Sequence, residues 1–238
     1  MKLWRFASLG DGHFANAVRR GAWSRSADAC TLCRTSRTLR VSPLVIEWSP
    51  GSVWIGDFTL TGFDSDVLAT DAALSELAPY GGFGPGAVEM TEPTDLTAEQ
   101  LALPRVPLPY RGPPVHEMWV EHLVNLEPER STVKIEAPCR ACGSVKRTAV
   151  GVERRESKWD TTSHRLIQRQ IAREPGKGLF VRASDVGASG IFRVREFPAW
   201  VLATDVVREH IAARRLTNVA FMEVGDVVAD GVNSRQLT

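Results

Sequence analysis

The chain of 238 residues lacks any long apolar run. None of its hydrophobic stretches approaches the ~18 residues that a membrane-spanning helix needs, so no transmembrane segment is predicted. The first residues, Met-Lys-Leu-Trp-Arg-Phe, lead to Gly10-Asp11-Gly12 without the apolar core of a secretion signal. We therefore expect a cytoplasmic protein. Its composition, 43% hydrophobic and 24% charged, is ordinary for a globular chain of one large domain or two small ones.

Basic side chains are missing from a long part of the chain. Between Val41 and Pro104 there is no Lys, Arg or His. The acidic residues of that stretch are Glu47, Asp57, Asp64, Asp66, Asp71, Glu76, Glu89, Glu92, Asp95 and Glu99. Residues 140–182, in contrast, contain eleven Lys and Arg against four acidic residues. This segregation predicts either a charged partner or an internal contact between an acidic and a basic face.

Cysteine is scarce, but its four copies fall in a pattern. They form two CxxC pairs, Cys30/Cys33 and Cys139/Cys142, with none left over. Two such pairs supply the four thiolates of a tetrahedral zinc site, with Zn–S bonds of about 2.3 Å. We predict one structural zinc ion held by these four residues. The 105 residues between the pairs far exceed the roughly 15–20 of a compact zinc ribbon, which predicts a clasp between two halves of the chain.

Three alternatives to zinc remain at this point. Disulfides between the four cysteines are one, although a reducing cytoplasm favours metal. A redox CxxC is the second, but such motifs need one pair at a strand–helix junction rather than two distant pairs. A site that binds no metal is the third. Because protein ligands would fill all four positions, a zinc ion here would hold the fold rather than activate a water molecule.

A pentamer recurs in the chain. Val-Leu-Ala-Thr-Asp occupies residues 67–71 and again residues 201–205, each time after a CxxC pair and an aromatic, β-rich run at 53–58 or 191–194. In both copies an apolar strand is predicted to end at the threonine, Thr70 or Thr204. That threonine is suited to cap a helix, and the following aspartate suits the positive end of the helix.

A short amphipathic helix and a closing strand are predicted after each pentamer. The inward residues are expected to be Ala73, Leu74 and Leu77 in the first helix, and Val206, Val207 and Ile211 in the second. Pro79 and Gly81 should end the first helix. The closing strands are expected at 86–90 and 219–224. The repeated order of elements predicts an old duplication.

Fewer regular elements are predicted between the two units. Residues 91–114 contain six prolines and predict a surface loop. Strands are expected at 118–124 and 131–136. We therefore predict an α+β fold of two related strand–helix–strand halves joined by a four-cysteine zinc clasp. The expected division is residues 1–138 and residues 139–238. The first part contains the acidic segment, residues 41–104, and the Pro-rich loop. The second contains the basic segment, residues 140–182, and the second strand–helix–strand unit.

No catalytic motif is complete. His116-Glu117 opens like the zinc-protease motif H-E-x-x-H, but its fifth position is Val120. Residues 174–178 contain Gly-Lys but lack the earlier glycine and the Ser/Thr of a phosphate-binding loop. No catalytic residue is assigned, and the protein is not expected to be an enzyme.

The chain resembles the double-CXXCG motif family of myxobacteria. The resemblance is carried by the two CxxC pairs, by Cys-Arg-Ala-Cys-Gly at 139–143, and by the closing segment 190–224. Studied members of that family are cytoplasmic immunity proteins that bind and neutralise a cognate toxin. The resemblance implies that Cys30, Cys33, Cys139 and Cys142 are metal ligands. The sequence departs from the family pattern at Arg34, where a glycine would ease the turn around the metal.

The resemblance also implies a toxin protein as partner. Because no long apolar run is present, no membrane partner is expected, and nucleic acid is not the expected partner. An acidic face would suit a toxin that carries a basic cleft. Asp57, Asp64 and Asp66 are the candidate partner-binding residues, because they lie in a stretch punctuated by Gly56 and Gly62 that is expected to reach the surface. The alternative function is a nucleic-acid-binding zinc protein that uses the basic segment 140–182.

Overall fold

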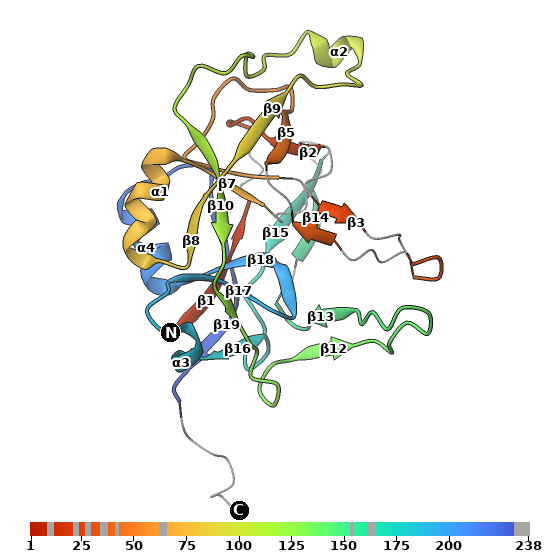
Figure 1. Ribbon diagram of the computed structural model, residues 1–238, viewed down its shortest axis with the longest axis vertical. Coiled ribbons are helices and arrows are strands. Elements are labelled where there is room, and N and C mark those ends of the chain that lie inside the picture. The colour runs from red at the N-terminus through yellow and green to blue at the C-terminus, as the bar shows by residue number, and fades with distance from the viewer. Residues whose placement is uncertain are drawn as a thin grey trace, which may run out of the picture.

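The computed structural model describes residues 1–8, 12–20, 24–26, 30–33, 38–40, 43–61, 66–152, 155–160 and 165–230 (Figure 1). In this part of the chain many strands combine with a few short helices, which agrees with the predicted α+β class. No described helix is long and apolar enough to cross a membrane.

The largest sheet has six strands, and the N-terminal strand lies inside it. Its order is β11 (Leu123–Val124), β17 (Ile191–Val194), β18 (Phe197–Thr204), β1 (Lys2–Ala7), β19 (Ala220–Val228) and β16 (Leu179–Arg182). Strand β1 is antiparallel to both of its neighbours, β18 and β19. The sheet of the C-terminal part of the chain is therefore completed by the first residues of the protein.

Two smaller sheets are built mainly from the first part of the chain. The four-stranded sheet has the order β6 (Phe58–Leu60), β7 (Val67–Thr70), β10 (Val115–Val120) and β8 (Phe83–Gly86). The three-stranded sheet has the order β2 (Ala17–Arg20), β5 (Leu44–Trp48) and β9 (Val88–Thr91). Only Ala87 separates β8 from β9, so the chain passes directly from one sheet into the other. The closing strand predicted at 86–90 is thus divided between two sheets.

Three two-stranded hairpins complete the strands of the described chain. They are β3 (Ser24–Ser26) with β4 (Thr38–Arg40), β12 (Val133–Ile135) with β13 (Arg147–Ala149), and β14 (Arg155–Asp160) with β15 (Arg165–Gln170). Among the described residues the helices are α1 (Asp71–Leu77), the 3-10 helix η2 (Ala78–Tyr80), α2 (Ala98–Leu101), α3 (Ala183–Val186) and α4 (Asp205–Ala213).

Both pentamers form the predicted junction between a strand and a helix. Strand β7 ends at Thr70, which is the N-cap of α1, and its Oγ1 accepts a hydrogen bond from the Ala73 backbone at 3.2 Å. Strand β18 ends at Thr204, the N-cap of α4. The side chain of Thr204 makes no capping hydrogen bond within the described helix. The predicted junction is confirmed in both copies, and the predicted cap bond in the first.

The two helices bury the faces expected of them, with one exception. Ala73, Leu74 and Leu77 of α1 are buried, as are Val207 and Ile211 of α4. Val206 was expected to face inward but is 53% exposed. Residues 207 and 211 are one turn apart and share a face, whereas residue 206 is rotated by about 100° from 207.

Two further strand predictions need correction. In the run 53–58, strand β6 begins only at Phe58, and the Trp54 side chain is 66% exposed. The strand expected at 118–124 is interrupted, because β10 ends at Val120 and β11 starts at Leu123. The backbone N–H groups of residues 121 and 122 both donate to the Gly82 carbonyl, which turns the chain at this point. Residues 92–114 form the predicted loop, apart from helix α2.

The buried apolar side chains form three clusters. The central cluster contains side chains from α1 and α4 and from strands of both the six-stranded and the four-stranded sheet. In Figure 1, α1 and α4 lie side by side. The second cluster covers the six-stranded sheet, around Leu179 and Val224, and the third covers the three-stranded sheet, around Ile46 and Trp48. The two main sheet regions are therefore joined through one shared core.

Candidate metal centre

Each CxxC pair lies at the turn of a two-stranded hairpin. In the first hairpin Ser26 pairs with Thr38, four residues before Cys30 and five residues after Cys33. In the second, Ile135 pairs with Arg147, four residues before Cys139 and five after Cys142. The two hairpins thus present their cysteines in the same strand register, although 105 residues separate the pairs.

The four sulfur atoms converge on one point. The Sγ atoms of Cys30 and Cys139 are 3.8 Å apart, and those of Cys33 and Cys142 are 3.6 Å apart. All four Sγ atoms lie within 4.8 Å of one another. A tetrahedral site with Zn–S bonds of about 2.3 Å places its sulfurs about 3.8 Å apart, so the geometry fits a metal ion bound by four thiolates. A disulfide would need sulfurs about 2.05 Å apart, and all four cysteines are free.

The turn of the second hairpin is closed by backbone hydrogen bonds. The Gly143 N–H donates to the Cys139 carbonyl at 2.8 Å, and the Cys139 N–H donates to the Ser144 carbonyl at 2.9 Å. Gly143 has φ +70°, a conformation that side chains other than glycine disfavour. This confirms the reason given for a glycine after the second cysteine. The corresponding Arg34 lies outside the described residues.

The thiols influence one another electrostatically. Backbone N–H groups of Cys33 and Leu32 lower the pKa of Cys30. The Ser144 backbone N–H lowers the pKa of Cys142, but burial and the neighbouring thiols outweigh it and raise that pKa to about 12. Four thiolates this close repel one another, and a bound divalent cation supplies the compensating charge.

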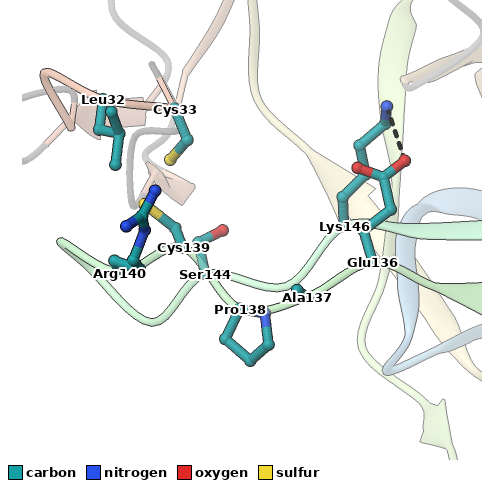
Figure 2. Close-up of a pocket in the computed structure, with 9 residues that line it drawn as sticks. All are labelled: Leu32, Cys33, Glu136, Ala137, Pro138, Cys139, Arg140, Ser144 and Lys146. Carbon is teal, nitrogen blue, oxygen red and sulfur yellow. Dashed lines mark ion pairs between the residues drawn. The ribbon is translucent and has the colours of Figure 1, made fainter.

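A pocket of about 350 Å³ lies beside the second hairpin (Figure 2). Its lining residues are Leu32, Cys33, Glu136, Ala137, Pro138, Cys139, Arg140, Ser144 and Lys146. Lys146 Nζ and a Glu136 carboxylate oxygen, 3.2 Å apart, form an ion pair across the hairpin. Because Cys33 and Cys139 both line the pocket, small molecules can approach the sulfurs from this side.

The two predicted partner-binding aspartates that the structure describes, Asp57 and Asp66, do not form one exposed surface. Asp66 is 1% exposed, so the expectation that it reaches the surface is wrong. Its carboxylate accepts a hydrogen bond from Thr61 Oγ1 at 2.9 Å and lies 3.3 Å from Arg19 Nη1, which fixes the start of β7. Asp64 lies outside the described residues.

Asp57 is half-buried and joins two distant segments. Its carboxylate accepts hydrogen bonds from the Thr217 backbone N–H and from Thr217 Oγ1, both at 2.7 Å. The Asp57 backbone N–H donates to the same threonine hydroxyl at 2.9 Å. The contacts of Asp57 in the structure are therefore structural ones, between the loop before β6 and the loop after α4.

The sequence did not show which carboxylates of the acidic segment lack an ion pair with a basic side chain. Glu47 pairs with Arg20 at 2.7 Å, and Glu76 pairs with Arg214 at 3.0 Å. Four exposed acidic residues form no ion pair with any described basic side chain: Glu89, Glu92, Asp95 and Glu99. Three of these four lie in the loop that contains α2.

Three of the described basic side chains of residues 140–182, those of Lys146, Arg173 and Arg182, pair with acidic residues from outside the acidic segment. Arg173, whose side chain is 6% exposed, lies between Glu223 at 2.9 Å and Asp226 at 2.6 Å. Arg182 pairs with Glu127. Among the described side chains, the acidic and basic segments therefore do not neutralise each other. The side chains of residues 153–170 lie outside this description.

No family model matches this chain, and no curated protein matches it. The resemblance to the double-CXXCG family therefore stays a prediction that rests on the cysteine pattern and the closing segment.

Proposed function

We propose that this protein is an immunity protein that binds and neutralises a cognate toxin, with one structural zinc ion. The observation that supports it is the convergence of Cys30, Cys33, Cys139 and Cys142, two CxxC pairs distant in sequence, on one closed four-sulfur site. This is the feature for which the double-CXXCG family is named. A site closed by four thiolates leaves no position for a catalytic water molecule, which favours a binding protein over a metal enzyme.

Zinc is the metal that this ligand set favours. Tetrahedral sites of four thiolates select zinc or iron, and structural sites of this kind in cytoplasmic proteins are commonly zinc sites. The zinc ion would join the hairpins β3–β4 and β12–β13, as the proposed clasp requires. The two strand–helix–strand units are, in this proposal, related copies, since their identical pentamers form the same junction.

The proposed partner surface lies on the exposed carboxylates of the acidic segment. Glu89, Glu92, Asp95 and Glu99 are exposed and have no described basic partner. Exposed apolar side chains accompany three of them in the loop that contains α2, with Leu101 at 58% and Leu103 at 47% exposure. A partner with a basic surface complements this combination, and charge complementarity speeds association and selects the partner.

The proposal is tested with the protein encoded by the neighbouring gene, used in an inactivated form as bait. We expect the purified chain to bind this bait, and to protect cells that express its active form. A chain that neither binds the bait nor protects cells would contradict the proposed function. Steep salt-dependent binding of RNA or DNA by the purified chain would instead support the nucleic-acid alternative.

The surface is tested separately, by reversing the charges of Glu89, Glu92 and Glu99 to Lys. We expect weaker, salt-sensitive binding of the bait with an unchanged circular dichroism spectrum. Reversal of Glu121, Glu129 and Glu174, which are also exposed, is the matched control. Equal binding by both triple variants would exclude the acidic surface and leave the function intact. Asp66 is unsuited to this test, because Asp66→Lys would place a buried positive charge beside Arg19.

A further inference from the structure

Strands β1 and β10 occupy the same position in two different sheets. Strand β10 lies between β7 and β8, and β1 lies between β18 and β19. The residue pairs Val115↔Thr70 and Glu117↔Leu68 join β10 to β7. The pairs Leu3↔Thr204 and Arg5↔Leu202 join β1 to β18 in the same antiparallel register. Each strand therefore contacts the same positions of the Val-Leu-Ala-Thr-Asp segment.

The strands around them repeat as well. The hairpin β6–β7 pairs Phe58 with Ala69, and the hairpin β17–β18 pairs Ile191 with Ala203. Strand β5 runs parallel to β9 from Leu44, as β16 runs parallel to β19 from Leu179. The succession β6, β7, β10, β8–β9, β5 thus corresponds to β17, β18, β1, β19, β16.

The buried side chains follow the same correspondence. The central cluster contains both members of five corresponding pairs: Phe6/Met118, Val67/Val201, Ala69/Ala203, Ala73/Val207 and Leu77/Ile211. In four more pairs, one residue belongs to the second cluster and the other belongs to the third cluster or packs against it: Leu3/Val115, Leu179/Leu44, Val181/Ile46 and Leu202/Leu68. Two equivalent units packed about an approximate two-fold axis would share one central cluster and divide the other two in this way.

In chain order, the first strand of each unit lies in the sheet of the other unit. Strand β1 precedes Cys30, β5, β7, α1 and β8–β9, as β10 precedes Cys139, β16, β18, α4 and β19. Yet β1 pairs with β18 and β19, and β10 pairs with β7 and β8. We propose that the chain is a fused dimer of one unit, and that its two copies, residues 1–91 and 115–230, have exchanged their first strands.

This proposal does not depend on the proposed function, and it changes the role of the metal. Each exchanged strand is deeply buried in the other copy, with Leu3 at 0%, Phe6 at 1% and Met118 at 0% exposure. The copies are then held together by two central strands and the shared core, independently of the cysteines. A bound metal ion joins only the ends of the two cysteine hairpins, which belong to separate two-stranded sheets (Figure 1).

The first experiment cuts the full-length chain between the copies. A protease site is inserted after Ala102, an exposed residue directly after α2, and the purified protein is cleaved there. We expect both fragments to elute together at the size of the intact protein, with or without a metal chelator. Fragments that separate on cleavage or on chelation, without denaturant, would overturn the proposal.

The second experiment identifies the neighbour of β1 without altering the core. Lys2 Nζ lies 2.7 Å from a Glu223 carboxylate oxygen, so a zero-length carbodiimide should join these two residues. In the cleaved protein this bond links the two fragments, and mass spectrometry locates it. The Lys2→Arg variant keeps the charge but has no reactive amine, and it is the control. A link from Lys2 to residues 83–91 instead of Glu223 would show that β1 stays in its own copy.

Discussion

The two Val-Leu-Ala-Thr-Asp junctions have the same sequence but different supporting contacts. In the first, Thr70 caps α1 with its side chain, and the Asp71 backbone N–H donates to the Pro114 carbonyl at 3.0 Å. In the second, the Asp205 carboxylate accepts hydrogen bonds from the Lys2 backbone N–H at 2.6 Å and from Trp4 Nε1 at 2.7 Å. The local sequence sets where the strand ends and the helix begins, while the adjacent strand, β10 or β1, decides which side chain secures the junction.

The largest expected effect concerns the two cysteine hairpins. If they contribute equally to one site, Cys30→Ser and Cys139→Ser should each lower the zinc content from one ion per chain to near zero. Zinc binding to such sites contributes roughly 10–16 kcal/mol of apparent free energy at neutral pH. Elemental analysis of protein purified without chelator measures this content. A content near two zinc ions per chain would show that the hairpins do not form one shared site. Retention of zinc by one of the two mutants would show that the hairpins do not contribute equally.

Truncation of corresponding core residues should affect both copies alike. Leu77 and Ile211 are 0% and 2% exposed and belong to the same cluster. Leu77→Ala and Ile211→Ala should each lower the free energy of unfolding by about 2–5 kcal/mol, because each leaves a cavity in the shared core. Urea denaturation followed by circular dichroism measures the loss. A small loss in only one variant would mean that the two copies do not share one core.

The aspartates of the two junctions should respond differently. Asp205→Asn weakens two hydrogen bonds to β1 and should cost about 1–3 kcal/mol, since hydrogen bonds to charged groups are the stronger ones. Asp71 is exposed, and one of its carboxylate oxygens lies 3.6 Å from His116 Nε2. Asp71→Asn should therefore cost less than about 1 kcal/mol. Denaturation of the two variants side by side provides the measurement, and equal losses would contradict the contrast.

The threonines should show the opposite contrast. Thr70→Ala removes the side-chain cap of α1 and should cost about 1 kcal/mol. Thr204→Ala removes no capping bond of the described helix and should cost less. Thermal unfolding of both variants resolves this difference. A larger loss at Thr204 would show that its hydroxyl has a role other than capping.

The smallest expected effect is a pH dependence of stability that comes from the contacts of Glu223 with Lys2 and Arg173. Burial raises the pKa of Glu223, but hydrogen bonds from Lys2 and Arg173 outweigh it, so that the net pKa is lowered. A lowered carboxyl pKa stabilises the fold above the unfolded value of about 4.3, and this contribution is lost as the pH falls through the folded value. Glu223→Gln should therefore flatten the decline in stability below about pH 4.5. If the decline in stability at acid pH is unchanged in Glu223→Gln, the contacts of Glu223 with Lys2 and Arg173 are not its source.

Some of these features could be predicted from the sequence, because interactions between residues close together in the chain determine them. The pentamer, with an apolar strand followed by Thr and Asp, was enough to place both junctions, and the helical spacing of Leu74 and Leu77 placed the inner face of α1. The CxxC spacing was enough to predict that the four cysteines meet. Val206 shows the limit of that reasoning, since an apolar residue next to an inward position can still face solvent.

Only the tertiary structure decided which segments meet over long distances. The sequence around Asp66 suggests an exposed loop, but a contact with Arg19, 47 residues away, buries the carboxylate. The residues of β1 and β10 do not show which sheet each strand joins, because the backbone hydrogen bonds that pair antiparallel strands are the same for any two strand edges. The position of β1 between β18 and β19 follows from packing Leu3 and Phe6 into two clusters at once. The sequence by itself thus determined the junctions and the cysteine pattern, whereas the fold decided the strand pairing and which charges remain exposed.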